Sequence, residues 1–263
     1  MTAPDLRPRT PSELVDAAFR ILRAHYGEFV TCSALAYAPL LLLRLFVVGD
    51  PMRLLGAPGD FLQSDMLWST GVAFLGGWLV FSLMSAVLLG CAAQAYLGEE
   101  VHVGVAVRRT LPRVPLVLVG AGVRFVLMAV AFVFLFFPIL YVVALLFAVT
   151  PVIVLERGGL WTALRRSASL SKGRKWHVLN TLGLVAIIYY VLVLGFSVLA
   201  SVSGNFVVST IVSAVVTVLV YPVVAITETL LYYDARIQSE GLDIELMTVA
   251  LVRPAAQDAS ATS

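Results

Sequence analysis

The chain has 263 residues, of which 60% are apolar and only 13% are charged, and its formal net charge is +2. A soluble domain is about half apolar and about a quarter charged, so this chain has too little polar material to cover a globule of its size. The composition excludes an ordinary soluble protein and predicts a protein embedded in lipid.

The apolar residues fall into blocks long enough to cross a bilayer, which takes about 20 helical residues for about 30 Å of hydrocarbon. We expect membrane-spanning helices at residues 30–48, 71–97, 115–136, 139–156, 177–201 and 207–233. They form a single polytopic membrane domain over residues 1–252, followed by a disordered tail at 253–263.

The third and fourth blocks lie in one apolar run over residues 114–155, which is too long for a single crossing. Proline lacks a backbone donor and disfavours helix at the residue before it, so a tight turn is expected at Phe137-Pro138. The alternative is one kinked helix with a re-entrant end. It leaves five crossings and puts the two termini on opposite sides.

The distribution of basic residues favours six crossings, because Lys and Arg collect in cytoplasmic loops. With both termini in the cytoplasm, fifteen of the 18 basic residues lie inside and only Arg53 lies in an outer loop. Arg44 and Arg124 fall within apolar blocks. The six spans then form three hairpins, each preceded by a cytoplasmic amphipathic or basic segment.

The segment before the first hairpin has a clear helix start. Thr10 and Glu13 have the spacing of a capping box, and Pro11 suits the first helical position. We expect an interfacial helix over residues 11–28, lying flat on the inner leaflet. Its apolar face carries Leu14, Ala18, Ile21, Leu22 and Phe29.

A second interfacial helix is predicted over residues 160–175, with Leu160, Trp161 and Leu164 toward the membrane. Basic groups near an anionic leaflet contribute about 1 kcal/mol each. The predicted ligands of this segment are therefore anionic lipid headgroups, and the alternative is that its charges only fix topology. The predicted headgroup-binding residues are Arg165, Arg166, Lys172, Arg174 and Lys175.

Three polar side chains lie deep in apolar blocks, where ionisable groups are rare and need partners. We expect Arg124 and Glu228 to form an ion pair inside the bundle, with Gln94 at a similar depth in the same buried polar cluster. This cluster either lines a polar path or substrate site, or it braces the helices and fixes which of them are neighbours.

Two stripes of small residues predict close helix packing. One stripe is on the second span and the other on the sixth, and we expect them to face each other. The stripes are Ser82, Ala86 and Gly90, and Ser209, Ser213 and Thr217.

Catalytic motifs are missing from the sequence. His25, His102 and His177 have no second ligand at metal-binding spacing, and the chain has no glycine-rich phosphate loop and no Gly-x-Ser-x-Gly. We expect no catalytic residue, no metal or other cofactor, and no nucleic-acid partner.

Three stretches resemble a bacterial membrane domain found in front of some glycerophosphodiester phosphodiesterases and also as a stand-alone protein. They read TPSELVDAAFR at 10–20, PVIVLERGGLWTALRRS at 151–167 and LLYYDAR at 230–236. The family's motif positions include Glu156, Ser167, Asp234 and Arg236, beside the arginines already named.

The resemblance implies a multi-pass protein of the bacterial plasma membrane. It does not imply esterase activity, which belongs to a separate soluble barrel. We therefore expect a non-catalytic scaffold or lipid-interacting accessory. The alternative is a transporter or channel for a small solute or lipid, with a polar site around Arg124 and Glu228, and an intramembrane enzyme comes third.

Overall fold

The computed structural model describes residues 9–48, 64–133 and 137–240. These ranges are helical and contain no strand, which confirms the predicted all-α membrane architecture. The tail predicted at 253–263 lies outside the described residues. The helical segments long and apolar enough to cross a membrane are six: Tyr26–Phe46, Gly71–Tyr96, Val103–Phe132, Ile139–Glu156, Lys175–Ser201 and Phe206–Ser239.

Helix α1 (Pro11–Ala24) begins with the predicted capping box. The Thr10 hydroxyl accepts a hydrogen bond from the backbone N–H of Glu13 at 3.4 Å, and the Glu13 carboxylate accepts one from the backbone N–H of Thr10 at 2.8 Å. The helix ends at residue 24 rather than 28, and His25 separates it from α2 (Tyr26–Leu43).

The apolar face of α1 is buried in protein. Leu14, Ala18 and Leu22 are 1%, 0% and 6% exposed, and α1 packs against α10 (Lys175–Ser201) and α11 (Phe206–Glu240). Other helices therefore cover this face, and the placement of α1 flat on the inner leaflet stays a prediction. Helical periodicity identifies an apolar face, but the same pattern is covered equally well by lipid or by other helices.

The first hairpin pairs α2 with α4 (Ser64–Tyr96). At its far end α2 continues as a wider π-helical turn, η1 (Arg44–Val48). The rings of Tyr37 and Phe81 meet edge to face between the two helices, with centroids 6.0 Å apart. This packing directs the first residue of η1, Arg44, toward the space beside α4.

The second hairpin starts with α5 (Val103–Thr110) and a 3₁₀ turn, and continues into α6 (Val114–Val133). The next helix, α7, covers Phe137–Leu146, so two separate helices replace the single kinked one. Pro138 is the second residue of α7, where its missing N–H breaks no helical hydrogen bond. The turn expected at Phe137-Pro138 is therefore wrong, and the connection between the helices lies outside the described residues.

The fourth span is interrupted. After α7 the chain forms α8 (Val149–Pro151) and a π-helical turn, η4 (Val152–Glu156). Pro151 has no N–H to offer the carbonyl group of Phe147, four residues earlier, so a regular helix cannot run through this point. The break falls at residues 147–148, directly before α8.

A serine of α9 (Leu160–Ser171) bridges this break. The Ser167 hydroxyl donates to the carbonyl oxygen of Leu145 at 2.7 Å and accepts from the backbone N–H of Ala148 at 3.1 Å. Ser167 is completely buried. It supplies the partners that the interrupted helix cannot supply itself, which is how broken membrane helices are tolerated.

The third hairpin packs α10 along α11, and the Ser197 and Ser213 hydroxyl oxygens lie 2.8 Å apart between them. The serine stripe of α11 therefore has a neighbour on α10. The stripe of α4 instead meets α5, because a Cβ atom on Gly90 would lie 3.3 Å from the Cβ of Ala106. The expectation that the two stripes face each other is wrong.

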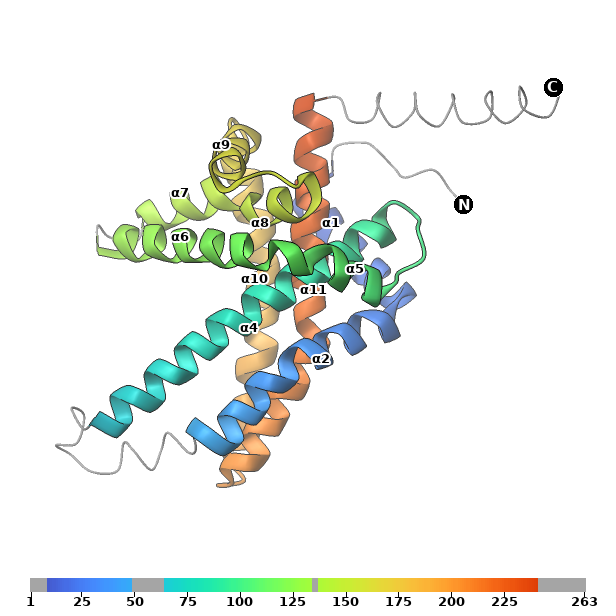
Figure 1. Ribbon diagram of the computed structural model, residues 1–263. Coiled ribbons are helices and arrows are strands. Elements are labelled where there is room, and N and C mark those ends of the chain that lie inside the picture. The colour runs from blue at the N-terminus through green and yellow to red at the C-terminus, as the bar shows by residue number, and fades with distance from the viewer. Residues whose placement is uncertain (1–8, 49–63, 134–136, 241–263) are drawn as a thin grey trace.

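The hairpins share a packed core at one end of the molecule. In the view of Figure 1 the α6–α7 pair points away from the α10–α11 pair, and the α2–α4 pair points between them. Fully buried side chains come from the ends next to the basic segments: Phe29, Met84, Ile153, Leu170 and Ile226. Large apolar side chains near the hairpin turns are exposed: Trp68, Phe132 and Val198. The hairpins thus spread outward from a common core.

Candidate functional site

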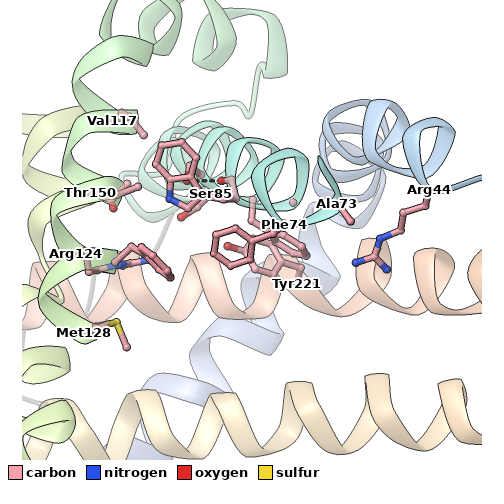
Figure 2. Close-up of a pocket in the computed structure, with 15 residues that line it drawn as sticks. Arg44, Ala73, Phe74, Ser85, Val117, Arg124, Met128, Thr150 and Tyr221 are labelled. Atoms are coloured by element: carbon pink, nitrogen blue, oxygen red, sulfur yellow. Dashed lines mark hydrogen bonds between the residues drawn. The ribbon is translucent and has the colours of Figure 1, made fainter. Parts of the chain in front are cut away.

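A cavity of about 410 Å³ opens between α4, α6 and α11, at the depth of the apolar blocks (Figure 2). Apolar rings and small residues form most of its wall. Its polar lining residues are Arg44, Ser82, Ser85, Arg124, Thr150 and Tyr221. An apolar cavity with a few polar groups, inside a membrane bundle, is the usual location of a binding site or pathway.

Two arginines enter this cavity from different hairpins. Figure 2 shows Arg124 at one end and Arg44 at the other, with Phe74 and Tyr221 between them. Both arginine side chains are half-buried, and among the described residues neither makes a hydrogen bond or a salt bridge. An arginine at the centre of a membrane helix costs about 2.5–3.5 kcal/mol, so Arg124, within α6, needs a compensating negative charge. Arg44 stands at the end of α2.

The structure brings Arg124 and Glu228 near each other without direct contact. Their charged groups interact electrostatically, and Tyr221, two turns before Glu228 on α11, interacts with both. Within the described chain no salt bridge joins Arg124 to Glu228. The predicted ion pair is thus a longer-range interaction around Tyr221, and Arg124 keeps its guanidinium in the cavity wall.

Gln94 lies apart from that cluster. Its side-chain oxygen accepts a hydrogen bond from the backbone N–H of His102 at 2.9 Å, where the chain leaves α4 for α5. Its side chain is 5% exposed and lines a different pocket. Gln94 therefore lines another pocket than Arg124, with which it was predicted to share a buried polar cluster.

The motif positions meet in a polar network at the packed end of the bundle. The Glu156 carboxylate accepts two hydrogen bonds from Nε of Arg166, at 3.1 and 3.0 Å, and one from the Tyr232 hydroxyl at 2.6 Å. Nε of Arg236 lies 3.9 Å from the same carboxylate. Glu156 therefore ties η4 to both α9 and α11.

Asp234 forms the second half of this network. Its carboxylate accepts the backbone N–H of Arg9 at 3.0 Å and the side-chain amide of Gln238 at 2.7 Å, and Nε2 of His177 lies 3.4 Å away. The neighbouring carbonyl oxygen, of Ala235, accepts from the Arg174 guanidinium at 2.8 Å. With Ser167 at the break in the fourth span, the motif positions hold helix ends together.

The predicted headgroup-binding residues divide into two groups. Arg166 and Arg174 are turned toward protein acceptors. The Arg165 guanidinium lies 5.1 Å from the centre of the Trp161 ring, the Lys175 ammonium lies 3.9 Å from that of Tyr141, and Lys172 is exposed. Headgroup binding stays a prediction for this surface, resting on Arg165, Lys172 and Lys175.

Sequence reasoning missed the role of Arg44 and Tyr221. Arg44 is visible in the sequence as a basic residue near the outer end of an apolar block, but only the packing of α2 on α4 brings it to the cavity of Arg124. Tyr221 gives no signal beyond a polar hydroxyl on a long apolar helix. In the described ranges no three His, Cys, Asp or Glu side chains come together as metal ligands.

Comparisons with protein-family models, with curated proteins and with solved structures gave no match to this chain. The family resemblance of the three sequence stretches therefore stays a prediction.

Proposed function

We propose that this chain is a non-catalytic protein of the bacterial plasma membrane that binds an anionic lipid between its hairpins. The observation that carries the proposal is the cavity that Arg124 and Arg44 line from opposite ends, with no salt bridge to either of them in the described chain. An anionic headgroup in this cavity offsets the unfavourable transfer of a guanidinium group into a low-dielectric environment.

An apolar groove beside the cavity supports a lipid rather than a small polar ion. A groove of about 510 Å³ runs along α6, and Trp78 lines both this groove and the cavity. The remaining residues of this groove are Leu118, Val119, Gly122, Val123, Val126 and Leu127. The arrangement matches an amphiphile, with its headgroup at the arginines and an acyl chain on α6.

Both termini are placed in the cytoplasm by this proposal. Six candidate spans and the hydrogen bond between Arg9 and Asp234 support termini on one side, and the basic segments support the cytoplasmic side. The resemblance to the membrane domain of phosphodiesterases supports the bacterial plasma membrane and an accessory role without catalysis.

Lipid content tests the proposal. We expect the double variant Arg44→Gln, Arg124→Gln, purified in mild detergent, to lose most of its copurified anionic phospholipid relative to zwitterionic phospholipid, as measured by mass spectrometry. The control is Arg20→Gln with Arg23→Gln on the exposed face of α1, which should keep the wild-type ratio. Loss in the surface variant alone, or an unchanged ratio in a folded cavity variant, would overturn the assignment of the lipid to the cavity.

Transport of the same lipid is the second candidate function. Glu228 favours it, because this acid extends the polar groups of the cavity along α11 toward the packed end. A fluorescent anionic lipid in proteoliposomes provides the test. Transbilayer movement of the lipid that depends on the protein and is slower with Glu228→Gln supports transport. Movement equal to that in protein-free vesicles shows that the protein binds the lipid without transporting it.

A further inference from the structure

A second, smaller pocket of about 200 Å³ lies at the opposite, basic end of the bundle, between the C-terminal end of α4, α5, η4 and α11. It shares no lining residue with the cavity of Arg44 and Arg124. Its polar lining residues are Gln94, Glu99, Arg109, Thr110, Arg157 and Tyr233. Nearly all of these offer hydrogen-bond donors, which is the composition of an anion site.

The lining of this pocket includes a buried hydroxyl that has no hydrogen-bond partner in the described chain, and a side-chain amide whose orientation is fixed. The side-chain oxygen of Gln94 is held by the backbone N–H of His102, and this fixes the amide so that its nitrogen is the group left for the pocket. Thr110 is 1% exposed, and its hydroxyl makes no hydrogen bond. Buried polar groups are almost always paired, so the unpaired Thr110 hydroxyl beside this pocket indicates a missing partner.

Arg157 gives an independent indication. It is the one non-glycine residue with a positive φ in the described chain, with φ 58° and ψ 28°. Glycine adopts this left-handed conformation without steric penalty, and Gly158 follows directly. The preference of basic residues for cytoplasmic loops explains a basic residue in this loop. It does not explain an arginine at the position where the backbone conformation suits glycine best. Such strain is typical of functional positions.

We propose that this pocket binds a phosphate monoester group, with Arg157 and Arg109 as its cationic ligands and with Gln94 and Thr110 as neutral donors. The two arginines outnumber the single carboxylate, Glu99, so the pocket favours an anion. Planar guanidinium groups bind phosphate oxygens through paired hydrogen bonds. The group comes either from a lipid headgroup of the inner leaflet or from a soluble phosphate.

The test separates the role of Arg157 in binding from its role in the fold. Inorganic phosphate is titrated into the full chain in detergent by calorimetry, and unfolding is followed in parallel. For Arg157→Gly we expect phosphate affinity to fall at least about tenfold, while the unfolding temperature stays the same or rises because the left-handed strain is relieved. Arg109→Gln should also bind weakly, and Arg108→Gln, one residue away on α5 and outside the pocket, is the matched control.

A second variant addresses the buried hydroxyl. Thr110→Val keeps the side-chain shape and removes a hydroxyl that has no protein partner, so we expect weaker phosphate binding without loss of stability. Wild-type affinity in both Arg157→Gly and Thr110→Val, or equal losses in Arg108→Gln and Arg109→Gln, would overturn the site.

Nanodiscs identify the source of the phosphate group. Thermal stabilisation by phosphatidic acid in phosphatidylcholine discs, lost in Arg157→Gly, indicates a lipid headgroup, and binding of inorganic phosphate alone indicates a soluble ligand. Binding of neither probe refutes the proposal. Because the arginines of the membrane cavity do not line this pocket, its failure leaves the lipid proposal untouched, and the reverse also holds.

Discussion

Replacing Ser167 by alanine should destabilise the whole bundle, although the serine lies on a short helix outside the spans. The change removes one hydroxyl that serves two backbone groups of the fourth span, the carbonyl of Leu145 at 2.7 Å and the N–H of Ala148 at 3.1 Å. Each buried polar group left without a partner costs about 1–3 kcal/mol. The two together give a loss of about 2–6 kcal/mol in the free energy of unfolding.

The assay is reversible unfolding of the purified protein in mixed micelles with increasing SDS, followed by helix signal. Ser169→Ala is the matched control on α9, because Ser169 is exposed and its hydroxyl donates only to the carbonyl of Arg166 in the same helix. Its expected effect is below about 0.5 kcal/mol. Equal, small losses in Ser167→Ala and Ser169→Ala would refute the reasoning that a side chain bridges the break in the fourth span.

Two further predictions concern the network and the topology. Glu156→Gln should lower the free energy of unfolding by about 1–3 kcal/mol, because a neutral amide cannot accept both hydrogen bonds from Arg166. A variant with wild-type stability would show that Glu156 does not contribute to holding the helix ends together. Single cysteines at Ser203 and Lys172, on a background without native cysteines, should react with a membrane-impermeant maleimide from opposite faces of the membrane, as judged in intact cells and inverted vesicles. Reaction of both from one face contradicts the six-span topology.

Local patterns predicted the elements of this fold well. Six long apolar blocks became six candidate spans, and the capping box at Thr10 formed with the expected partners, because both depend on neighbours in the sequence. Proline was ambiguous. At position 138 it starts a helix, whereas at 151 it coincides with a break, since the same ring is tolerated in the first turn and excluded from the interior.

Contacts between helices could not be predicted in the same way. Hydropathy gives the depth of a side chain, but the rotation of one helix against another depends on packing that the sequence does not state. Arg124 was predicted to be a deep charge, and the structure shows that it shares its cavity with Arg44 and Tyr221. Gln94, which was predicted at a similar depth, lines another pocket. The apolar face of α1 was likewise visible, but not the fact that α10 and α11 cover it.

That contact between α1 and the last two helices sets the order in which the protein is completed. The backbone of Arg9 bonds to Asp234, 225 residues later, so the first helix to be synthesised gains its docking surface only when the final hairpin has been inserted. Until then the surfaces of α10 and α11 that cover the apolar side of α1 are not both in place. Chains truncated before residue 206 should therefore be degraded rapidly, even though they contain all five of the preceding candidate spans.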